Sequence, residues 1–311
     1  MKPCTELKEK VEIKPVSNSN PFFSIIIPCF NCFRFLKKAI DSILAQSFSH
    51  YELIIVDNGS TDELSQWKIN NTANFRYLRL PENKGFPYAV NRGVEVSKGE
   101  YLLIMNADVF LDKDFLLNFK ERIKISPEIG LWQPLVLYPD GKRVYTTGLL
   151  ISRARRFYNI GEGEEREKWK EEREIWGPAG CCMVCKKEVF EDVGGFDEDF
   201  FFLLEDFDFA WRANKKGWKA RFFPGAVAYH WGRVTFDQYF RQYLSFRNRY
   251  LLLVKNEDFK SIIRDLPYIL LYDFLRIPYF SILNPYRFRA WRELIPLLWK
   301  MRRKRWKQQS V

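Results

Sequence analysis

The first 125 residues alternate short apolar runs with longer stretches in which apolar side chains recur every three or four residues. Short continuous apolar runs bounded by turns are typical of buried parallel strands, and the longer spacing is typical of helices. Strand–helix–strand alternation predicts an α/β fold with a single Rossmann-like, mostly parallel sheet flanked by helices. The expected strands are 23–27, 53–56, 75–80 and 101–105, and the expected helices are 33–44, 88–96 and 115–125.

The rest of the chain is less regular. Residues 153–175 are charged and have no clear strand pattern, which favours a mobile loop or an exposed helix. Two further strands are expected at 218–223 and 226–230. Proline disrupts helix interiors, so residues 256–311 are expected to form short helical pieces separated by Pro267, Pro278, Pro285 and Pro296.

Polar or turn-forming residues follow each of the four expected parallel strands, at 28–31, 57–62, 83–85 and 106–108. Ligands of open parallel sheets bind beyond the carboxyl ends of the strands. The sequence therefore predicts a ligand site at this edge of the sheet.

The segment VDNGSTD at 56–62 allows two interpretations. Asn58-Gly59 can form a turn, with Ser60 or Asp62 capping a following helix. Alternatively, the Asp57 carboxylate can accept the imide N–H of uracil or thymine, a donor that the ring nitrogen of cytosine lacks.

A metal site is the second candidate. Asn106-Ala107-Asp108 ends an apolar strand, and hard cations such as Mg²⁺ or Mn²⁺ bind carboxylates together with substrate phosphates. His230, one of two histidines, could be a second ligand. The alternatives are that Asp108 caps the next helix and that His230 is an ordinary buried imidazole.

Three acids, Glu205, Asp206 and Asp208, follow a run of phenylalanines and leucines. Acids in the first turn of a helix complement its dipole, which explains their presence but not the preceding aromatic run. The alternative is a general base at the rim of a pocket. Residues 200–204 are then expected to pack into the core and wall an acceptor pocket, and partial burial would raise the pKa of Asp206.

These motifs occur in an order that resembles the family-two inverting glycosyltransferases with the glycosyltransferase-A (GT-A) fold, most of all its rhamnosyltransferase-type members. The resemblance covers roughly residues 22 to 255. It is carried by SIIIPCFN (24–31), VDNGSTD (56–62), NKGFPYAVNRG (83–93), NAD (106–108), GGFDEDFFFLLEDFDFAWR (194–212) and His230.

The resemblance implies a catalytic domain at 22–255 between an N-terminal extension, 1–21, and a basic amphipathic helical tail, 256–311. It implies that Asp206 is the catalytic base, with Glu205 as the next candidate, and that Asp108 and His230 contact a divalent cation, Mg²⁺ or Mn²⁺. Asn106 stands where the family commonly has Asp, so the nucleotide is expected to hold much of the cation. The implied nucleotide contacts are Pro28, Phe30, Asn31, Asp57, Asn58, Asn83, Lys84, Gly85, Asn91, Asn106 and Ala107.

The implied reaction is inverting transfer of a sugar, such as rhamnose, from a UDP- or dTDP-sugar to a hydroxyl of a glycan or lipid-linked acceptor, in surface polysaccharide synthesis. A sugar nucleotidyltransferase is an alternative, although the turn PCFNCF after the first strand lacks the glycines of a phosphate loop. A non-catalytic module that binds nucleic acid or membrane is the other alternative.

The tail carries most of the net charge. Residues 261–311 contain 11 Lys and Arg against 3 Asp and Glu, a net +8 of the +11 of the chain. Trp291, Leu294 and Leu298 recur at helical spacing, which predicts an interfacial helix on an anionic membrane rather than a nucleic-acid contact. The alternatives are packing on the catalytic domain or a homodimer contact. The basic cluster expected to touch lipid is Arg302, Arg303, Lys304, Arg305 and Lys307.

The tail is too short and too charged, in its apolar part at 265–283, to be expected to span a membrane, and the first residues lack a secretory signal. A cytoplasmic enzyme at the inner face of the cell membrane is therefore expected. Cys29/Cys32 and Cys182/Cys185 have a spacing compatible with zinc, but their apolar surroundings favour reduced buried thiols.

Overall fold

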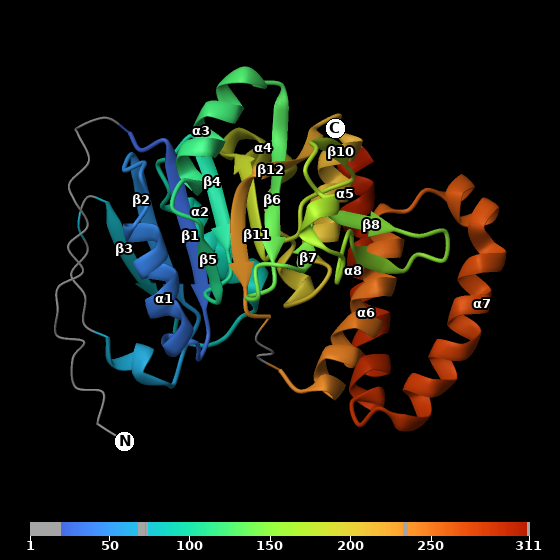
Figure 1. Ribbon diagram of the computed structural model, residues 1–311. Helices are drawn as coiled ribbons and strands as arrows, with labels where there is room; N and C mark the ends of the chain where they lie inside the picture. The colour runs from blue at the N-terminus through green and yellow to red at the C-terminus, as the bar shows by residue number, and fades with distance from the viewer. Residues whose placement is uncertain (1–19, 68–71, 73, 233–235, 310–311) are drawn as a thin grey trace.

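The computed structural model describes residues 20–67, 72, 74–232 and 236–309, with the side chains of 306–309 outside the description. Its centre is a ten-stranded mixed sheet. Eight strands follow the order β10-β12-β6-β11-β4-β1-β2-β3, while β5 pairs with β12 and β7 pairs with β6. Figure 1 shows helices around this sheet and three long C-terminal helices to one side of it.

The four strands expected in the first half form the parallel part of the sheet, and this prediction is confirmed. Parallel pairing of β1 with β2 and β4, and of β2 with β3, places their carboxyl ends at one edge. The three expected helices are also present. The elements are β1 (Phe23–Cys29), α1 (Phe33–Leu44), β2 (Tyr51–Asp57), the 3-10 turn η1 (Glu63–Gln66), β3 (Phe75–Arg79), α2 (Phe86–Glu95), β4 (Tyr101–Met105) and α3 (Phe115–Ile125).

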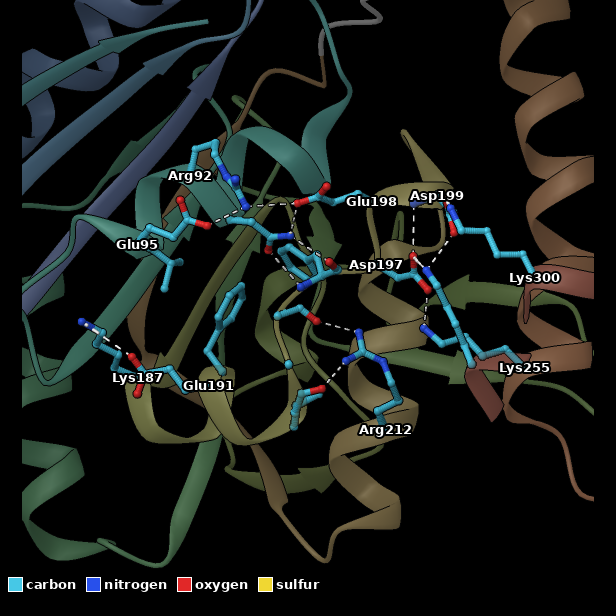
Figure 2. A pocket seen from close by; sticks show the side chains of 18 residues that line it. Arg92, Glu95, Lys187, Glu191, Asp197, Glu198, Asp199, Arg212, Lys255 and Lys300 are labelled. Atoms are coloured by element: carbon cyan, nitrogen blue, oxygen red, sulfur yellow. Dashed lines mark hydrogen bonds and ion pairs between the residues drawn. The ribbon is translucent and has the colours of Figure 1, made fainter. Parts of the chain in front are cut away.

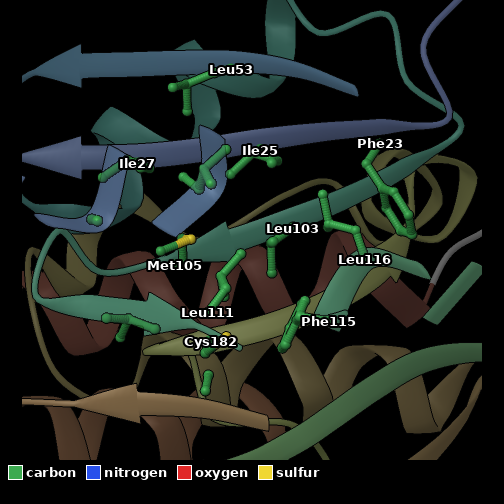
Figure 3. Close-up of a cluster of buried hydrophobic side chains, with 14 of the residues drawn as sticks. Phe23, Ile25, Ile27, Leu53, Leu103, Met105, Leu111, Phe115, Leu116 and Cys182 are labelled. Atoms are coloured by element: carbon green, nitrogen blue, oxygen red, sulfur yellow. The ribbon is translucent and has the colours of Figure 1, made fainter. Parts of the chain in front are cut away.

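Both faces of the parallel part are buried, which explains its nearly unbroken apolar strands. Alternate residues such as Ile25 and Leu103 pack under α1 and α3 (Figure 3), whereas Ile26 and Ile104 pack under helices on the other face. The strand positions therefore alternate between two separate cores, and polar residues become available to a ligand where the strands end.

The second half makes the sheet mixed, because β11 runs antiparallel to both β4 and β6. The two strands expected at 218–223 and 226–230 are one strand, β12, with a register shift between Phe223 and Val227. The elements are β5 (Val109–Leu111), β6 (Ile129–Leu137), β7 (Val144–Thr146), β11 (Cys182–Lys186), α4 (Lys187–Val193), the 3-10 turn η3 (Glu198–Phe200), α5 (Glu205–Lys215) and β12 (Lys219–His230).

The expectation of a mobile loop or exposed helix at 153–175 was wrong. This segment contains short strands and a buried ion pair: Arg155 is 5% exposed and contacts Glu257 and Asp265. Arg155 gave no local signal because both of its partners lie about a hundred positions away. The elements around it are β8 (Leu149–Ile151), β9 (Phe157–Asn159), the 3-10 turn η2 (Arg166–Lys168) and β10 (Arg173–Ile175).

The expectation of short C-terminal helical pieces was also wrong. Three long helices follow the sheet, α6 (Gln238–Asn256), α7 (Phe259–Leu283) and α8 (Arg287–Gln309). Pro267 and Pro278 lie inside α7 on its exposed side, and Pro296 lies inside α8. An exposed proline leaves its freed carbonyl to water, so packing of the opposite side can keep such a helix continuous. Pro285 alone of the four prolines falls in the break between two helices.

Candidate functional site

A cavity of about 110 Å³ lies at the carboxyl ends of the parallel strands. It brings together residues from six segments of the chain, and four of these contribute eight residues singled out from the sequence: Pro28, Phe30, Asn58, Asn83, Gly85, Asn106, Ala107 and Asp108. Phe86, Phe201, Phe202 and Phe236 add an aromatic wall, and Cys29 and Cys32 complete the lining.

Asn58 joins two of these segments. Its Nδ2 donates to Asn83 Oδ1 at 2.9 Å and to the Gly85 carbonyl at 3.0 Å, and its Oδ1 accepts from the Lys84 backbone N–H at 3.1 Å. Gly85 has φ +92°, and a Cβ there would lie 2.3 Å from the Phe201 carbonyl oxygen. Only glycine allows this approach, which connects the 83–85 turn to the loop before Glu205.

Asp57 is fully buried, and its carboxylate is occupied by the protein. Oδ1 accepts from the Ser60 N–H at 2.8 Å, and Oδ2 accepts from the Tyr77 hydroxyl at 2.8 Å and from Arg79. Asp57 is not among the residues that line the cavity. The turn interpretation of VDNGSTD is present alongside this arrangement, because Asp62 caps η1 by accepting from Leu64 N–H.

Asn31 has φ +51° and fixes the end of β1 to the end of β2. Its Oδ1 accepts from the Thr61 N–H at 2.8 Å, and its own N–H donates to Ser60 Oγ at 3.0 Å. Lys84 is partly exposed, 5.2 Å from the centre of the Tyr88 ring. Both side chains are therefore near the cavity without being part of its lining.

Antiparallel pairing of β12 with β5 brings two metal candidates together, because His230 lies opposite Val109 in the register. His230 Nε2 is 3.2 Å from Asp108 Oδ1 and 3.5 Å from Asn106 Nδ2. Asp108 and His230 are each at least nine-tenths buried, and His230 Nδ1 has no hydrogen-bond partner among the described residues.

These residues fit a small hard cation. Ligands about 2.1 Å from an octahedral Mg²⁺ lie about 3 Å apart when they are neighbours, close to the 3.2 Å between Asp108 Oδ1 and His230 Nε2. No group of three or more His, Cys, Asp or Glu side chains with metal-site geometry occurs in the described part of the chain. A cation here would thus need further ligands from a substrate.

Asp206, the candidate base, lies beside the Gly180-Cys181 turn. Its Oδ2 accepts from the Gly180 N–H at 2.9 Å and its Oδ1 from the Phe207 N–H at 2.9 Å, while burial raises its pKa. The Cys181 carbonyl in turn accepts from the Asn106 N–H at 2.9 Å. Two adjacent residues thereby connect the candidate base to the candidate metal ligands.

Glu205 is more buried than Asp206, at 6% exposure, and its Oε2 has no hydrogen-bond partner among the described residues. Burial and the neighbouring Asp206 carboxylate raise its pKa well above the usual range. A neutral Glu205 therefore suits the core, and Asp206 is the acid with access to solvent.

Asp208 is structural. It is fully buried and bonded to Arg212, Lys255 and Asn256. These two cations hold the pKa of Asp208 below its usual range despite burial.

Sequence reasoning missed the residues that hold the loop before Asp206. Phe201, Leu203 and Leu204 have φ of 63°, 70° and 69°, the left-handed region that non-glycine residues rarely adopt. Asn248 of α6 is fully buried, and its Nδ2 lies 2.7–2.9 Å from the carbonyl oxygens of Phe200, Phe202 and Leu203. The only sequence signal is the polar run Arg247-Asn248-Arg249 inside an aromatic helix.

A second, larger cavity of about 780 Å³ lies between α2, α4, α8 and the 194–199 loop (Figure 2). Its charged side chains pair with one another, for example Lys255 and Lys304 with Asp197, and Lys300 with Asp199. Asn91 lines this cavity and not the first, and its side chain holds residues 196 and 198.

Among the described residues, the cysteines do not form a metal-binding group of three or more side chains. Cys29, Cys182 and Cys185 are buried, and Cys182 and Cys185 contribute to the cores on opposite faces of the sheet. Burial raises the pKa of all three thiols. Cys4 lies outside the described residues.

The chain is similar in sequence to two kinds of curated protein. It is 26% identical over 218 residues to N-acetylglucosaminyl-diphospho-decaprenol L-rhamnosyltransferase of Mycobacterium tuberculosis, covering 63% of this chain and 71% of that protein. It is 22% identical over 229 residues to poly-beta-1,6-N-acetyl-D-glucosamine synthase of Staphylococcus aureus, covering 72% of this chain and 54% of the synthase.

Solved structures share the fold at low identity. GalNAc-T7 with UDP, GalNAc and Mn²⁺ superposes with a TM-score of 0.62 at 14% identity, covering 93% of this chain and 55% of that chain. The mannosyltransferase PcManGT from Pyrobaculum calidifontis with GDP-Man and Mn²⁺ has a TM-score of 0.53 at 19% identity, covering 95% and 78%. The sheet and its flanking helices are those of the GT-A glycosyltransferases.

Residues 24–194, more than half of the chain, match the family described as Glycosyl transferase family 2. The matched segment contains the strand-end residues around the smaller cavity, and the candidate base follows it directly. The protein is a glycosyltransferase and belongs to glycosyl transferase family 2.

Proposed function

We propose that this enzyme transfers a sugar from a UDP- or dTDP-sugar to a hydroxyl group of a lipid-linked or glycan acceptor, with inversion at the anomeric carbon. The observation that carries the proposal is the Gly180-Cys181 turn, which contacts both Asp206 and the backbone of Asn106. A base and a cation site held by one turn suit a single displacement, in which a hydroxyl is deprotonated while a diphosphate leaves.

In this mechanism the donor occupies the smaller cavity, with its diphosphate near Asp108 and His230. Asp108 and His230 would hold Mg²⁺ or Mn²⁺ there, and the cation would supply positive charge to offset that of the leaving nucleoside diphosphate. Asp206 accepts the proton of the acceptor hydroxyl as that oxygen attacks the anomeric carbon, and one in-line attack inverts the configuration. Phe201 and Phe202 wall the site and reduce its access to water.

The proposed preference for uracil or thymine rests on Asp57 at the end of β2, adjacent to Asn58 in the cavity lining. The three hydrogen bonds to its carboxylate leave little acceptor capacity, so an imide would have to use a remaining lone pair of a buried carboxylate oxygen. Thermal shifts with UDP, dTDP, CDP and GDP plus Mn²⁺ measure this preference. Equal stabilisation by CDP and UDP would remove its basis.

The acceptor proposal draws on the rhamnosyltransferase relative, whose name specifies a diphospho-decaprenol carrier. A lipid-linked acceptor implies work at a membrane, and we place the enzyme at the inner face of the cell membrane, in surface polysaccharide synthesis. The sugar itself, rhamnose or another, is left to a donor screen that follows release of nucleoside diphosphate.

Asp206→Asn tests the base directly, because the amide keeps the shape of the side chain and cannot take the proton. We expect kcat to fall by roughly 10²–10⁴-fold with donor affinity nearly unchanged. Asp192→Asn is a matched control, because Asp192 lies on the surface of α4 with Lys216. Near-normal turnover of Asp206→Asn with intact donor binding would contradict the assignment.

A further inference from the structure

The side of helix α7 that faces the protein carries two aspartates, and the side that faces outward is apolar. Asp265 and Asp273 are 0% and 8% exposed. Asp265 contacts Arg153 and Arg155, and Asp273 contacts Arg249, which is itself fully buried. These ion pairs attach α7 to the rest of the protein.

The opposite side of α7, here called its outer face, is apolar and exposed. Positions three and four residues apart lie on one side of a helix, so these side chains form a continuous surface. Figure 1 places α7 at the edge of the molecule farthest from β3. The outer face consists of Ile263 (56% exposed), Leu266 (40%), Leu270 (58%), Leu271 (68%), Phe274 (74%), Leu275 (69%) and Ile282 (69%).

Within the described parts of α7 and α8, the exposed charges are positive. The three acids between 259 and 305 are Asp265, Asp273 and Glu293, and all are held in ion pairs with arginines. Trp291 and Trp299 of α8 are 40% and 61% exposed. Apolar residues with tryptophan and a cationic border are the composition of a membrane-interface surface. The exposed cations are Lys260, Arg264, Arg289, Arg292, Lys300, Arg302 and Arg303.

In the structure, the surface with the composition of a membrane interface differs from the one expected from the sequence. Leu294 of α8 is 5% exposed and Leu298 is half-buried, and both pack with the cluster that holds Leu251 and Leu252 of α6, so this part of the apolar stripe expected to touch lipid faces the protein while Trp291 stays exposed. Lys304, from the basic cluster, pairs with Asp197 and Asp199. The side chain of Lys307 lies outside the described residues.

We propose that the outer face of α7 binds an anionic lipid bilayer, with the helix lying in the plane of the interface. This inference deepens the proposed membrane location and rests on it. A second copy of the chain is the less suitable occupant, because its identical cationic border would meet the first with like charges. Lipid headgroups of negative charge complement the same border.

The geometry favours a helix that lies flat. With 25 residues, α7 is long and apolar enough to cross a membrane by length and composition, so the expectation that this segment is too short was wrong, although core helices pass the same test. Crossing would move Asp265 and Asp273 away from their arginines into hydrocarbon, which is costly. Lying in the interface keeps these ion pairs and buries only the outer face.

Vesicle co-sedimentation of the full chain tests the proposal. We expect binding to vesicles of phosphatidylglycerol and phosphatidylcholine, weaker binding to phosphatidylcholine alone, and loss of binding in the double variant Leu271→Glu, Phe274→Glu. The matched control is Ile125→Glu on α3, which is 76% exposed and distant from α7 in sequence and fold. The control should bind as the unchanged protein does.

Two further measurements separate the possible outcomes. Light scattering reports the oligomeric state: if the α7 variant only converts a dimer to a monomer and still binds vesicles, a second copy covers this face and the proposal fails. UDP release with a water-soluble acceptor reports catalysis. Vesicle binding without turnover would contradict the proposed function alone, and turnover without vesicle binding would contradict the α7 proposal alone.

Discussion

At the scale of single residues, the two adjacent acids at the start of α5 have different environments. Glu205 is buried with an unpartnered Oε2, whereas Asp206 accepts two backbone N–H bonds and is partly exposed. Burial raises the pKa of both, and the Asp206 charge raises that of Glu205 further. The two acids can therefore act differently, with Glu205 neutral and Asp206 titrating.

The raised pKa of Glu205 gives a prediction for stability. A carboxyl group with a folded-state pKa above its unfolded value of about 4.3 favours the folded state below that value, and the advantage is lost as pH rises through the folded pKa. Removing the ionisable group should remove this loss. We expect Glu205→Gln to make the free energy of unfolding decline less steeply above pH 4.3 than in the unchanged protein.

Urea unfolding at a series of pH values measures this decline. Glu188→Gln, an exposed acid of α4, is the control and should leave the pH dependence unchanged. Identical slopes for Glu205→Gln and the unchanged protein would show that Glu205 is ionised in the fold.

Asn248 is the residue on which the geometry before Asp206 most depends. Asn248→Ala leaves the Phe202 and Leu203 carbonyls without their side-chain donor, while the Phe200 carbonyl keeps Arg247, at a cost of about 1–3 kcal/mol of stability. Because Asn248 does not line the donor cavity, we expect kcat to fall roughly tenfold or more with KM for the donor nearly unchanged. Steady-state kinetics separates these two parameters.

The control for Asn248 is Asn118→Ala on α3. Asn118 also donates to a backbone carbonyl, that of Gly225, at 2.7 Å, and is exposed. It should lose little stability and no activity. A rise in donor KM equal to the fall in kcat/KM for Asn248→Ala would argue against a positioning role.

At the scale of elements, α8 reaches the catalytic region through ion pairs. Lys300 contacts Asp199, and Lys304 contacts Asp197 and Asp199, in the segment directly before the left-handed loop (Figure 2). Burial of α6 against α8 supports the same region from the other side. The tail is thus packed on the domain that carries the site.

Because the tail is packed on the catalytic domain, removing it would disturb the fold as well as the tail's own contacts. A chain ending near Lys255 would lose α7 and α8 and uncover Tyr243 and Leu244 of α6, which are 0% and 1% exposed. The double substitution Lys300→Gln, Lys304→Gln removes only the ion pairs of α8 with Asp197 and Asp199. We expect it to lower kcat roughly tenfold to a hundredfold by releasing the loop that precedes Asp206.

Arg302→Gln with Arg303→Gln is the matched control, because it removes the same charge from exposed positions of the same helix. Its kcat should remain close to that of the unchanged enzyme, while vesicle binding weakens by about 1 kcal/mol per charge. Equal loss of kcat in both double variants would show that net charge, and not the contact with residues 197–199, is what matters.

At the scale of the whole molecule, the sheet and the C-terminal helices support different parts of the candidate site. The parallel half of the sheet supplies most of the cavity proposed for the donor, and the C-terminal helices hold the loop before the proposed base, Asp206. The outer face of α7 lies on the far side of these helices. One consequence is that a membrane contact at α7 and the loop before Asp206 are separated by only the α6 and α8 layer.

The sequence by itself determined the parallel half of the fold and the strand-end residues around the cavity. Apolar strands such as 101–105 are buried on both faces, so their pattern is local and strong, and parallel pairing brings their ends to one edge whatever follows. The position of Asp108 after β4 and of Asp206 at the start of α5 could be predicted in this way.

Only the tertiary structure decided the rest. Arg155, Asn248 and Lys304 find their partners 45 to 110 residues away, and no local pattern encodes such a pair. The same reason explains the orientation of α7. In the sequence its aspartates interrupt an apolar segment, whereas in the structure they are buried in ion pairs with distant arginines and the leucines on the opposite side are exposed. A hydrophobic pattern indicates which residues share a side of a helix, but tertiary packing determines which side faces the protein.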